Sequence, residues 1–166
     1  MSDSIWIRAM TEQDIDLVLH WRNHFNIRRF MLTQHEISLE EHTIWFKRVS
    51  TDPKRKLMLV EENGQPLGFV QFSNVGADEV SDWGFYVRPN APKGSGRKLG
   101  EAALTHAFQA WNLHKVCGQA IAENIASISF HQRLGFVQEG VLREQSKISG
   151  KRTDLFCFGL LKSEWK

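Results

Sequence analysis

The stretch Trp83–Leu104, WGFYVRPNAPKGSGRKLGEAAL, decides the fold that we expect for this chain. Residues 83–87 read as a strand and lead into a loop with two prolines and two glycines, and a run of good helix formers follows. A glycine-containing loop at a helix N-terminus gathers free backbone N–H groups at the positive end of the helix dipole. The stretch therefore predicts a place that holds a phosphate or pyrophosphate, and a ligand-free turn entering a helix is the alternative.

Length and composition indicate one domain over residues 1–166, large enough to bury a sizeable core. The share of charged residues, 24%, is typical of a globular protein, and a net charge of +2 is too small to indicate nucleic-acid binding. The sequence has no run apolar enough for a signal peptide or a membrane span, so we expect a cytoplasmic protein with no membrane partner. Cys117 and Cys157 lack metal or redox spacing, and we expect two buried thiols rather than a disulfide.

Periodicity and capping signals predict the elements in order. Thr11 with Asp14, and Ser38 with Glu41, are helix-start signals, while Asn63-Gly64 is a hairpin turn. The helix after Ser38 is expected to turn 44–46 and Val49 inward. The predicted strands are 5–8, 56–61, 67–72, 80–87, 113–123, 136–146 and 152–161, and the helices begin near 11, 26, 38, 97 and 124.

This order predicts a single mixed α/β domain without linker or repeat. The hairpin makes part of the sheet antiparallel, whereas the segment 83–122 is expected to form a parallel strand–helix–strand crossover. The glycine loop matches neither of two common phosphate-binding motifs. It lacks the Lys-Ser/Thr ending of a Walker A loop, and Gly94, Gly96 and Gly100 do not have the spacing of a dinucleotide fingerprint.

A second motif gives the loop a more specific meaning. The stretch Asn124–Phe136, NIASISFHQRLGF, resembles the asparagine–helix–Leu-Gly-Phe signature of the Gcn5-related N-acetyltransferases (GNAT). In that family a Gln/Arg-x-x-Gly-x-Gly/Ala loop cradles the pyrophosphate of acetyl-CoA, and Ala91–Gly96 is the matching stretch here. The first motif position is Ala91, so cations nearby are expected to supply the missing charge. The resemblance covers most of the chain and implies a central twisted mixed sheet flanked by helices, with parallel strands splayed around the CoA site.

The resemblance implies acetyl-CoA as co-substrate and assigns residues to its parts. The backbone at the end of the strand is expected to pair with the pantetheine amides. Asn124 is expected to bond the pantetheine arm or to fix the splayed strand. The expected pantetheine residues are Phe85, Tyr86 and Val87, and the expected pyrophosphate residues are Lys93, Gly94, Ser95, Gly96, Arg97 and Lys98.

The family often has a Tyr seven residues after the motif Asn, where it protonates the departing thiolate. This chain has His131 at that position, so the proton donor is either an imidazolium or water. Asp82 lies on the strand beside the expected acetyl site and is the predicted general base, with His35 and Glu36 as the alternative. Direct transfer needs no covalent enzyme intermediate, and Cys117 is not expected to act as a nucleophile.

The segment 19–46 resembles one branch of the family, which acetylates the 4-amino group of a UDP-linked amino-dideoxy sugar in pseudaminic acid synthesis for flagellin glycosylation. Such an acceptor requires cations for its diphosphate and an aromatic ring for uracil, which Arg22, Arg28, Arg29 and Trp45 offer, although Trp45 also fits a core position. The residues predicted to bind this substrate are Arg22, Asn23, His35, Glu36 and Trp83.

Two other functions remain open from the sequence. Ribosomal-protein N-terminal acetyltransferases share much of the C-terminal pattern, and a non-catalytic acyl-CoA-binding module would need only the cofactor site. The seven-residue spacing of His35 and His42 does not suit a metal on a helix, so no metal is expected. Domains of this family commonly pair through their late strands, which implies a homodimer.

Overall fold

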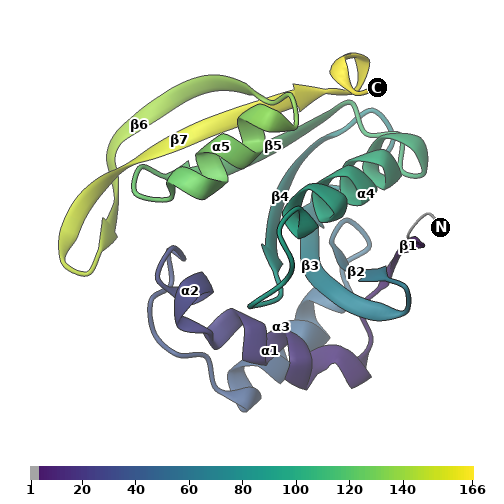
Figure 1. Cartoon of the computed structure of the whole chain (residues 1–166), viewed down its shortest axis with the longest axis horizontal. Coiled ribbons are helices and arrows are strands. Elements are labelled where there is room, and N and C mark those ends of the chain that lie inside the picture. The colour runs from purple at the N-terminus through teal and green to yellow at the C-terminus, as the bar shows by residue number, and fades with distance from the viewer. Residues whose placement is uncertain (1–3) are drawn as a thin grey trace.

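The computed structural model describes residues 4–166 and contains one mixed sheet of seven strands, in the order β1-β2-β3-β4-β5-β7-β6 (Figure 1). The strands are β1 (Ile5–Ala9), β2 (Lys56–Glu62), β3 (Gln65–Ser73), β4 (Val80–Val87), β5 (Lys115–Ile121), β6 (Val137–Ile148) and β7 (Lys151–Leu161). The helices are α1 (Ile15–Asn23), α2 (Phe25–Arg28), α3 (Leu39–Ser50), α4 (Ser95–Gln109) and α5 (Ile125–Arg133), with 3-10 turns at Glu12–Asp14 and Lys162–Glu164.

Among residues 4–166, the pairing of β4 with β5 is the one parallel contact in the sheet, and it is short. Only three pairs hold it, Val80–Lys115, Ser81–Val116 and Asp82–Cys117. Beyond Asp82 the two strands separate, while β4 continues to pair with β3 as far as Val87. This confirms the predicted parallel crossover and produces the splayed strands that the family resemblance implies. The other neighbouring strands are antiparallel.

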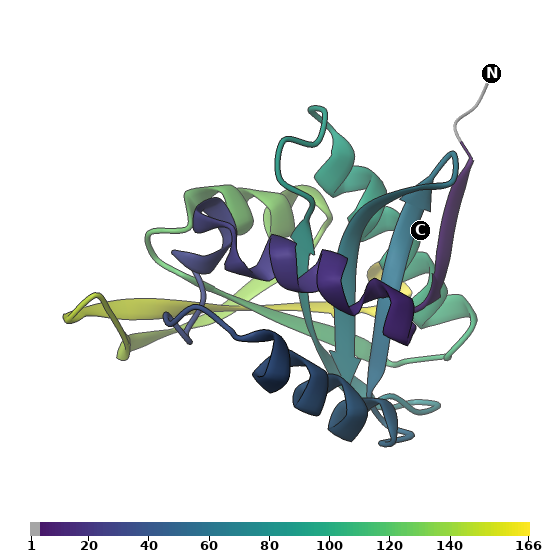
Figure 2. The same ribbon diagram turned by 90° about the horizontal axis from the view of Figure 1, so that it is seen from below.

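Helices cover the sheet on both faces and create two separate cores (Figures 1 and 2). α4 and α5 pack on one face, where Leu99, Leu104 and Phe108 lie against Phe72, Trp83 and Phe158. α1 and α3 pack on the other face over β2 and β3. Fully burying each large apolar side chain contributes about 1.5–3 kcal/mol to folding. The second core contains Val18, Trp21, Phe46, Val49, Leu59, Phe69 and Tyr86.

Local sequence signals place several element ends as predicted. The Ser38 hydroxyl accepts the Glu41 N–H at 3.1 Å and begins α3. Asn63 and Gly64 both have positive φ angles, as the two-residue turn between β2 and β3 requires. Gly135, with φ +98°, ends α5.

One of the predicted inward positions is wrong. Ile44 is 57% exposed because α3 buries the stripe His42, Phe46 and Val49 instead. In residues 4–166 no helix is both long and apolar enough to cross a membrane.

Candidate active site

A cleft of about 810 Å³ opens where β4 and β5 separate. Its walls come from both strands, from α5 and from the segment around α2. It passes through the sheet, because it is lined by Trp83 and Gly118, which face α5, and by Asp82 and Tyr86 on the opposite face. Of the residues predicted to be catalytic or to bind cofactor, the cleft brings together Asp82, Phe85, Tyr86, Val87, Gly96, Asn124 and His131.

The loop before α4 has the geometry of an anion-binding helix start. Gly94 adopts φ +93° and caps α4, a conformation that costs glycine little. The Ser95 N–H donates to Pro92 O at 3.1 Å, so this predicted donor is already engaged. The Gly96 and Arg97 amides follow in the first turn, where a helix leaves N–H groups without acceptors. Helix α4 begins two residues earlier than predicted, and Gly96 reaches the cleft.

The three predicted cations differ in what they contact. The Lys98 ammonium lies 3.0 Å from Glu62 and is therefore committed to a salt bridge with β2. Arg97 pairs with Glu101 at 2.8 Å on the exposed face of α4. Lys93 is exposed and has no ion-pair partner in the described part of the chain. Lys93 is thus the cation whose charge is most available to the loop.

Asn124 has a structural role at the start of α5. Its side-chain oxygen accepts the Ser127 N–H at 3.2 Å and caps the helix. The cap fixes the direction of α5 as it leaves β5, which holds one wall of the cleft in place. Asn124 also lines the cleft, so its amide group remains next to the predicted pantetheine site.

His131 is enclosed in an aromatic cage and is only 1% exposed. The Trp83 Nε1–H donates to His131 Nε2 at 3.1 Å, and His131 Nδ1 lies 2.8 Å from the Ser127 carbonyl. Since an indole only donates and a carbonyl only accepts, the proton must reside on Nδ1. Burial lowers the pKa of His131, which favours this neutral ring. Phe85, Phe130, Phe136 and Phe158 complete the cage.

The neutral His131 ring presents no proton to the cleft. Its Nδ1 proton is held by Ser127, and its Nε2 lone pair is held by Trp83. His131 lines the cleft, but its hydrogen bonds differ from those of an imidazolium acid. Trp83, predicted to bind substrate, is buried as the partner of this ring.

Asp82 is exposed at the point where β4 and β5 separate, opposite Cys117. Its carboxylate has no hydrogen-bond or ion-pair partner among residues 4–166, so it is available to accept a proton. Burial raises the pKa of the Cys117 thiol, which disfavours the thiolate. Cys117 and Cys157 are both free, as predicted, and each is half-buried rather than fully buried.

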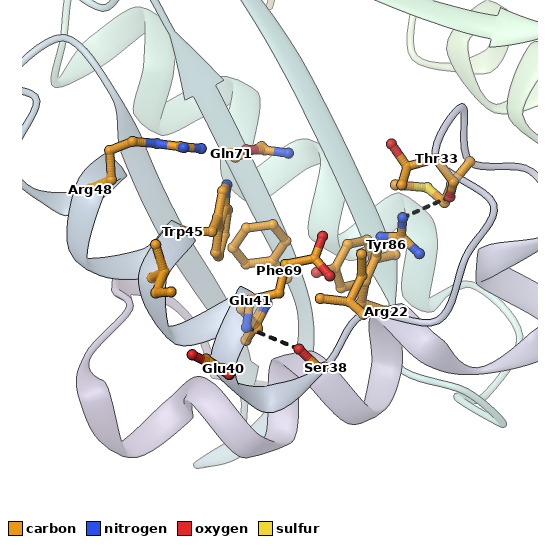
Figure 3. Close-up of a pocket in the computed structure, with 14 residues that line it drawn as sticks. Arg22, Thr33, Ser38, Glu40, Glu41, Trp45, Arg48, Phe69, Gln71 and Tyr86 are labelled. Atoms are coloured by element: carbon orange, nitrogen blue, oxygen red, sulfur yellow. Dashed lines mark hydrogen bonds between the residues drawn. The ribbon is translucent and has the colours of Figure 1, made fainter.

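A second pocket of about 590 Å³ lies between the sheet and α3 (Figure 3). A row of rings crosses it, with centroids 6.2 Å apart for Trp45 and Phe69 and 5.0 Å apart for Phe69 and Tyr86. Burial raises the pKa of Tyr86, so its phenol stays neutral. Met31, Gln71 and Tyr86 line this pocket as well as the cleft, which makes the two cavities neighbours.

Arg22 is the buried cation of the second pocket, with 9% exposure. One of its terminal nitrogens, Nη2, donates to the Thr33 carbonyl at 2.9 Å (Figure 3). The other, Nη1, is buried and has no hydrogen-bond partner. Burial lowers the pKa of Arg22, yet a guanidinium stays charged in proteins. An unpaired buried N–H of this kind costs free energy until a ligand oxygen accepts it.

Three other predicted substrate residues, Asn23, His35 and Glu36, are not among the residues that line these two cavities. Asn23 exchanges two hydrogen bonds with the Ile37 backbone, at 2.7 and 2.8 Å, and thereby ties α1 to the segment before α3. His35 contacts Glu41 at 3.0 Å, and Glu36 lies 3.9 Å from Arg28. Residues 4–166 contain no cluster of three side chains suited to hold a metal.

Several residues that line the pockets were not predicted from the sequence. Gln71 and His42 are the most informative of these, because each is a polar residue on a strand or helix face that otherwise packs apolar side chains. The alternation of β3 places Gln71 on the same face as Phe69, a signal that was available in the sequence. Glu41 and Arg48 also line the second pocket.

Comparison with known proteins identifies the family. Residues 4–137 match the acetyltransferase (GNAT) domain. Acetyltransferase PseH of Campylobacter jejuni subsp. jejuni serotype O:23/36 (strain 81-176) is 29% identical over 127 residues, which cover 76% of this chain and 79% of that protein. Spermidine N(1)-acetyltransferase of Vibrio cholerae serotype O1 is 23% identical over 168 residues, 99% of this chain and 97% of that protein.

The fold has solved counterparts. The crystal structure of spermidine N-acetyltransferase from Vibrio cholerae in complex with CoA and spermine superposes with a TM-score of 0.88, at 24% identity and covering 96% of each chain. At this identity the likeness shows the fold. Taken with the family match over residues 4–137, it places the chain in the GNAT family, as an acetyl-CoA-dependent N-acetyltransferase.

Proposed function

We propose that the enzyme acetylates the 4-amino group of a UDP-linked amino-dideoxy sugar, a precursor of pseudaminic acid. The observation that carries this proposal is the buried Arg22 with an unpaired Nη1, in a pocket that adjoins the β4–β5 cleft. Guanidinium N–H groups pair well with phosphate oxygens. The diphosphate of a nucleotide sugar would satisfy Arg22, and the sugar amine would then lie toward Gln71, Tyr86 and the cleft.

The aromatic row supports a nucleotide in the same pocket. Trp45 stacks on His42 with centroids 5.0 Å apart, and it lines the pocket while remaining half-buried. A partly exposed indole offers a flat surface on which uracil can stack. This arrangement meets both requirements of the acceptor, a cation for phosphate and a ring for the base.

Spermidine is the second candidate acceptor, because the Vibrio cholerae relative is named for it. Glu40 and Glu41 also line the pocket, and carboxylates attract a polyamine. However, Arg22 and Arg48 line it too, and the Glu41 carboxylate is paired with His35. A polycation that carries only N–H donors would leave Arg22 Nη1 unpaired, so the charges favour the anionic acceptor.

The proposed chemistry uses few residues of the chain. Acetyl-CoA supplies an acetyl thioester, held with its pyrophosphate at the Gly96 and Arg97 amides near Lys93 and its pantetheine along Phe85, Tyr86 and Val87. The lone pair of the acceptor amine forms the new C–N bond, and Asp82 takes a proton from that amine. The C–S bond breaks, and water returns a proton to the thiolate, because the one proton of the neutral His131 ring is on Nδ1 and is held by the Ser127 carbonyl.

The experiment measures CoA release with acetyl-CoA and each of three acceptors: the UDP-4-amino sugar, spermidine and the N-terminal peptide of a ribosomal protein. We expect release with the sugar and a product heavier by one acetyl group. CoA release with only spermidine or only the peptide would contradict the proposed substrate. Binding of acetyl-CoA without release with any amine would indicate a non-catalytic module.

An Arg22→Met variant sharpens this test, since Met keeps the length and packing of the stem. It should lower kcat/KM for the sugar by roughly tenfold to a hundredfold and leave the Kd for acetyl-CoA unchanged. We also propose a homodimer through the late strands, supported by the exposed Val137, Val141 and Leu142 on β6. Light scattering after gel filtration gives the mass directly.

A further inference from the structure

Gln71 lies where the second pocket meets the cleft and lines both. It is on β3, paired in register with Gly84 of β4. Figure 3 shows it at the end of the pocket away from Ser38. Together with Met31 and Tyr86, it borders the junction between the two cavities.

Arg55 fixes which way this carboxamide points. The Arg55 Nη2 donates to Gln71 Oε1 at 3.3 Å. Because a guanidinium has only donors, the amide oxygen must face Arg55, and the amide nitrogen must face away from it. Gln71 therefore offers the cavity an N–H donor and no acceptor.

Gly84 makes room for that donor. A Cβ at position 84 would lie 3.5 Å from Gln71 Nε2, so the nitrogen lies directly over the glycine. Nε2 has no hydrogen-bond acceptor among residues 4–166. Position 84 is two residues beyond Asp82 on the same strand, and alternate strand residues share a face, so the Gln71 donor and the Asp82 carboxylate border one space.

We infer that Gln71 selects acceptors that carry an oxygen beside the reacting amine, through a hydrogen bond from Nε2 to that oxygen. This inference rests on the proposed function, in which the oxygen is the hydroxyl on the ring carbon next to the 4-amino group. The two groups divide the work. Asp82 accepts from the amine, whereas Gln71 donates to the neighbouring oxygen.

The chemistry of the amine explains why Gln71 does not bind it. The attacking nitrogen needs its lone pair for the thioester carbon, and an N–H donor on that lone pair would suppress attack. A protonated amine has no lone pair to accept with. Gln71 is therefore matched to amino alcohols and amino sugars, and it gives no favourable contact to spermidine, which has no oxygen.

The test compares wild type with Gln71→Met on two acceptors, the UDP-4-amino sugar and its analogue that lacks the neighbouring hydroxyl. Met keeps the side-chain length and removes the donor. We expect kcat/KM to fall roughly tenfold for the hydroxylated acceptor and by less than about twofold for the deoxy analogue. The Kd for acetyl-CoA should not change. Gln109→Met, on the exposed surface of α4, is the matched control and should behave as wild type.

Arg55 is a positioning residue in this scheme, so Arg55→Met should reproduce part of the same acceptor-specific loss. Adding it to Gln71→Met should cost little more, because the two changes remove one interaction. An equal loss on both acceptors would overturn the inference and point to the thioester carbonyl as the partner of Gln71. A wild type that does not acetylate the sugar would instead contradict the proposed function, and activity on spermidine alone would overturn both.

Discussion

The hydrogen bond from Trp83 Nε1 to His131 Nε2, 3.1 Å long, lies directly over the backbone of Gly118. A Cβ at Gly118 would be 2.4 Å from the imidazole nitrogen and 2.7 Å from the indole nitrogen. The bond joins β4 to α5 just where β4 and β5 part. This hydrogen bond therefore holds α5 against β4 in the region where β4 and β5 no longer pair with each other.

Gly118→Ala should separate this pair. The added methyl group has no room, so we expect a loss of about 1–3 kcal/mol in the free energy of unfolding, seen as a lower Tm. Gly140→Ala is the control, because a Cβ at that position meets no atom within 4 Å. Equal Tm values for the two variants would contradict the close contact at Gly118.

The stability of the protein should depend on pH through His131. Burial lowers the pKa of His131, so as the pH falls the unfolded chain takes up its proton first. The stabilisation is complete above about pH 6.5 and is lost as the pH drops below that value. Urea unfolding at pH 7.5 and pH 5.5 measures the loss.

His131→Phe should flatten this dependence by up to about 1.4 kcal/mol per pH unit. Part of the slope will remain, because burial also lowers the pKa of His42 and His106. An identical slope in wild type and variant would show that His131 is not neutral when folded. The same variant separates acid from structural roles. If kcat at pH 7.5 falls while the fold and acetyl-CoA affinity persist, the ring has a catalytic part after all.

Asp82→Asn should lower kcat by roughly 10²–10⁴-fold with little change in the Kd for acetyl-CoA. The amide has the same shape but accepts no proton, and the carboxylate makes no contact on which folding depends. Asp78→Asn, in the loop before β4, is the control and should retain full kcat. Full activity in Asp82→Asn would contradict the role of Asp82 as the base.

Lys93→Ala and Lys98→Ala should differ in their effect on the Kd for acetyl-CoA. Lys93 is free to face the pyrophosphate, so its loss should raise the Kd for acetyl-CoA by roughly twofold to fivefold, less at high salt. Lys98 is held by Glu62, so Lys98→Ala should leave the Kd unchanged and cost less than about 1 kcal/mol in stability. Titration calorimetry at two salt concentrations compares them.

The elements whose ends depend on residues close together in the sequence were predicted correctly. The predicted strand 80–87 has the bounds of β4, and Ser38, Asn63-Gly64 and Gly135 act as expected. Each of these depends on residues within a few positions of one another. The insertion of β7 between β5 and β6 was not predicted, since it depends on pairing across more than thirty residues and no local pattern encodes it.

The site was predictable as a set of positions more than as a set of contacts. Asp82, Asn124 and His131 do border one cleft. The burial of His131 depends on rings from β4, α5 and β7, and the clamp of Asn23 on Ile37 depends on a loop closing back on α1. The sequence alone does not show whether a histidine or an asparagine side chain will hydrogen-bond to the protein or to a ligand.

The three-pair junction of β4 and β5 has a consequence for how the protein should be handled. Only three residue pairs join the two halves of the sheet. The co-substrate that we propose to bind between β4 and β5 would connect the two strands where they no longer pair with each other. Bound co-substrate then stabilises the folded state by about 2.7 kcal/mol when its concentration is a hundredfold above its Kd. The enzyme should be most easily unfolded in the interval between releasing CoA and rebinding acetyl-CoA.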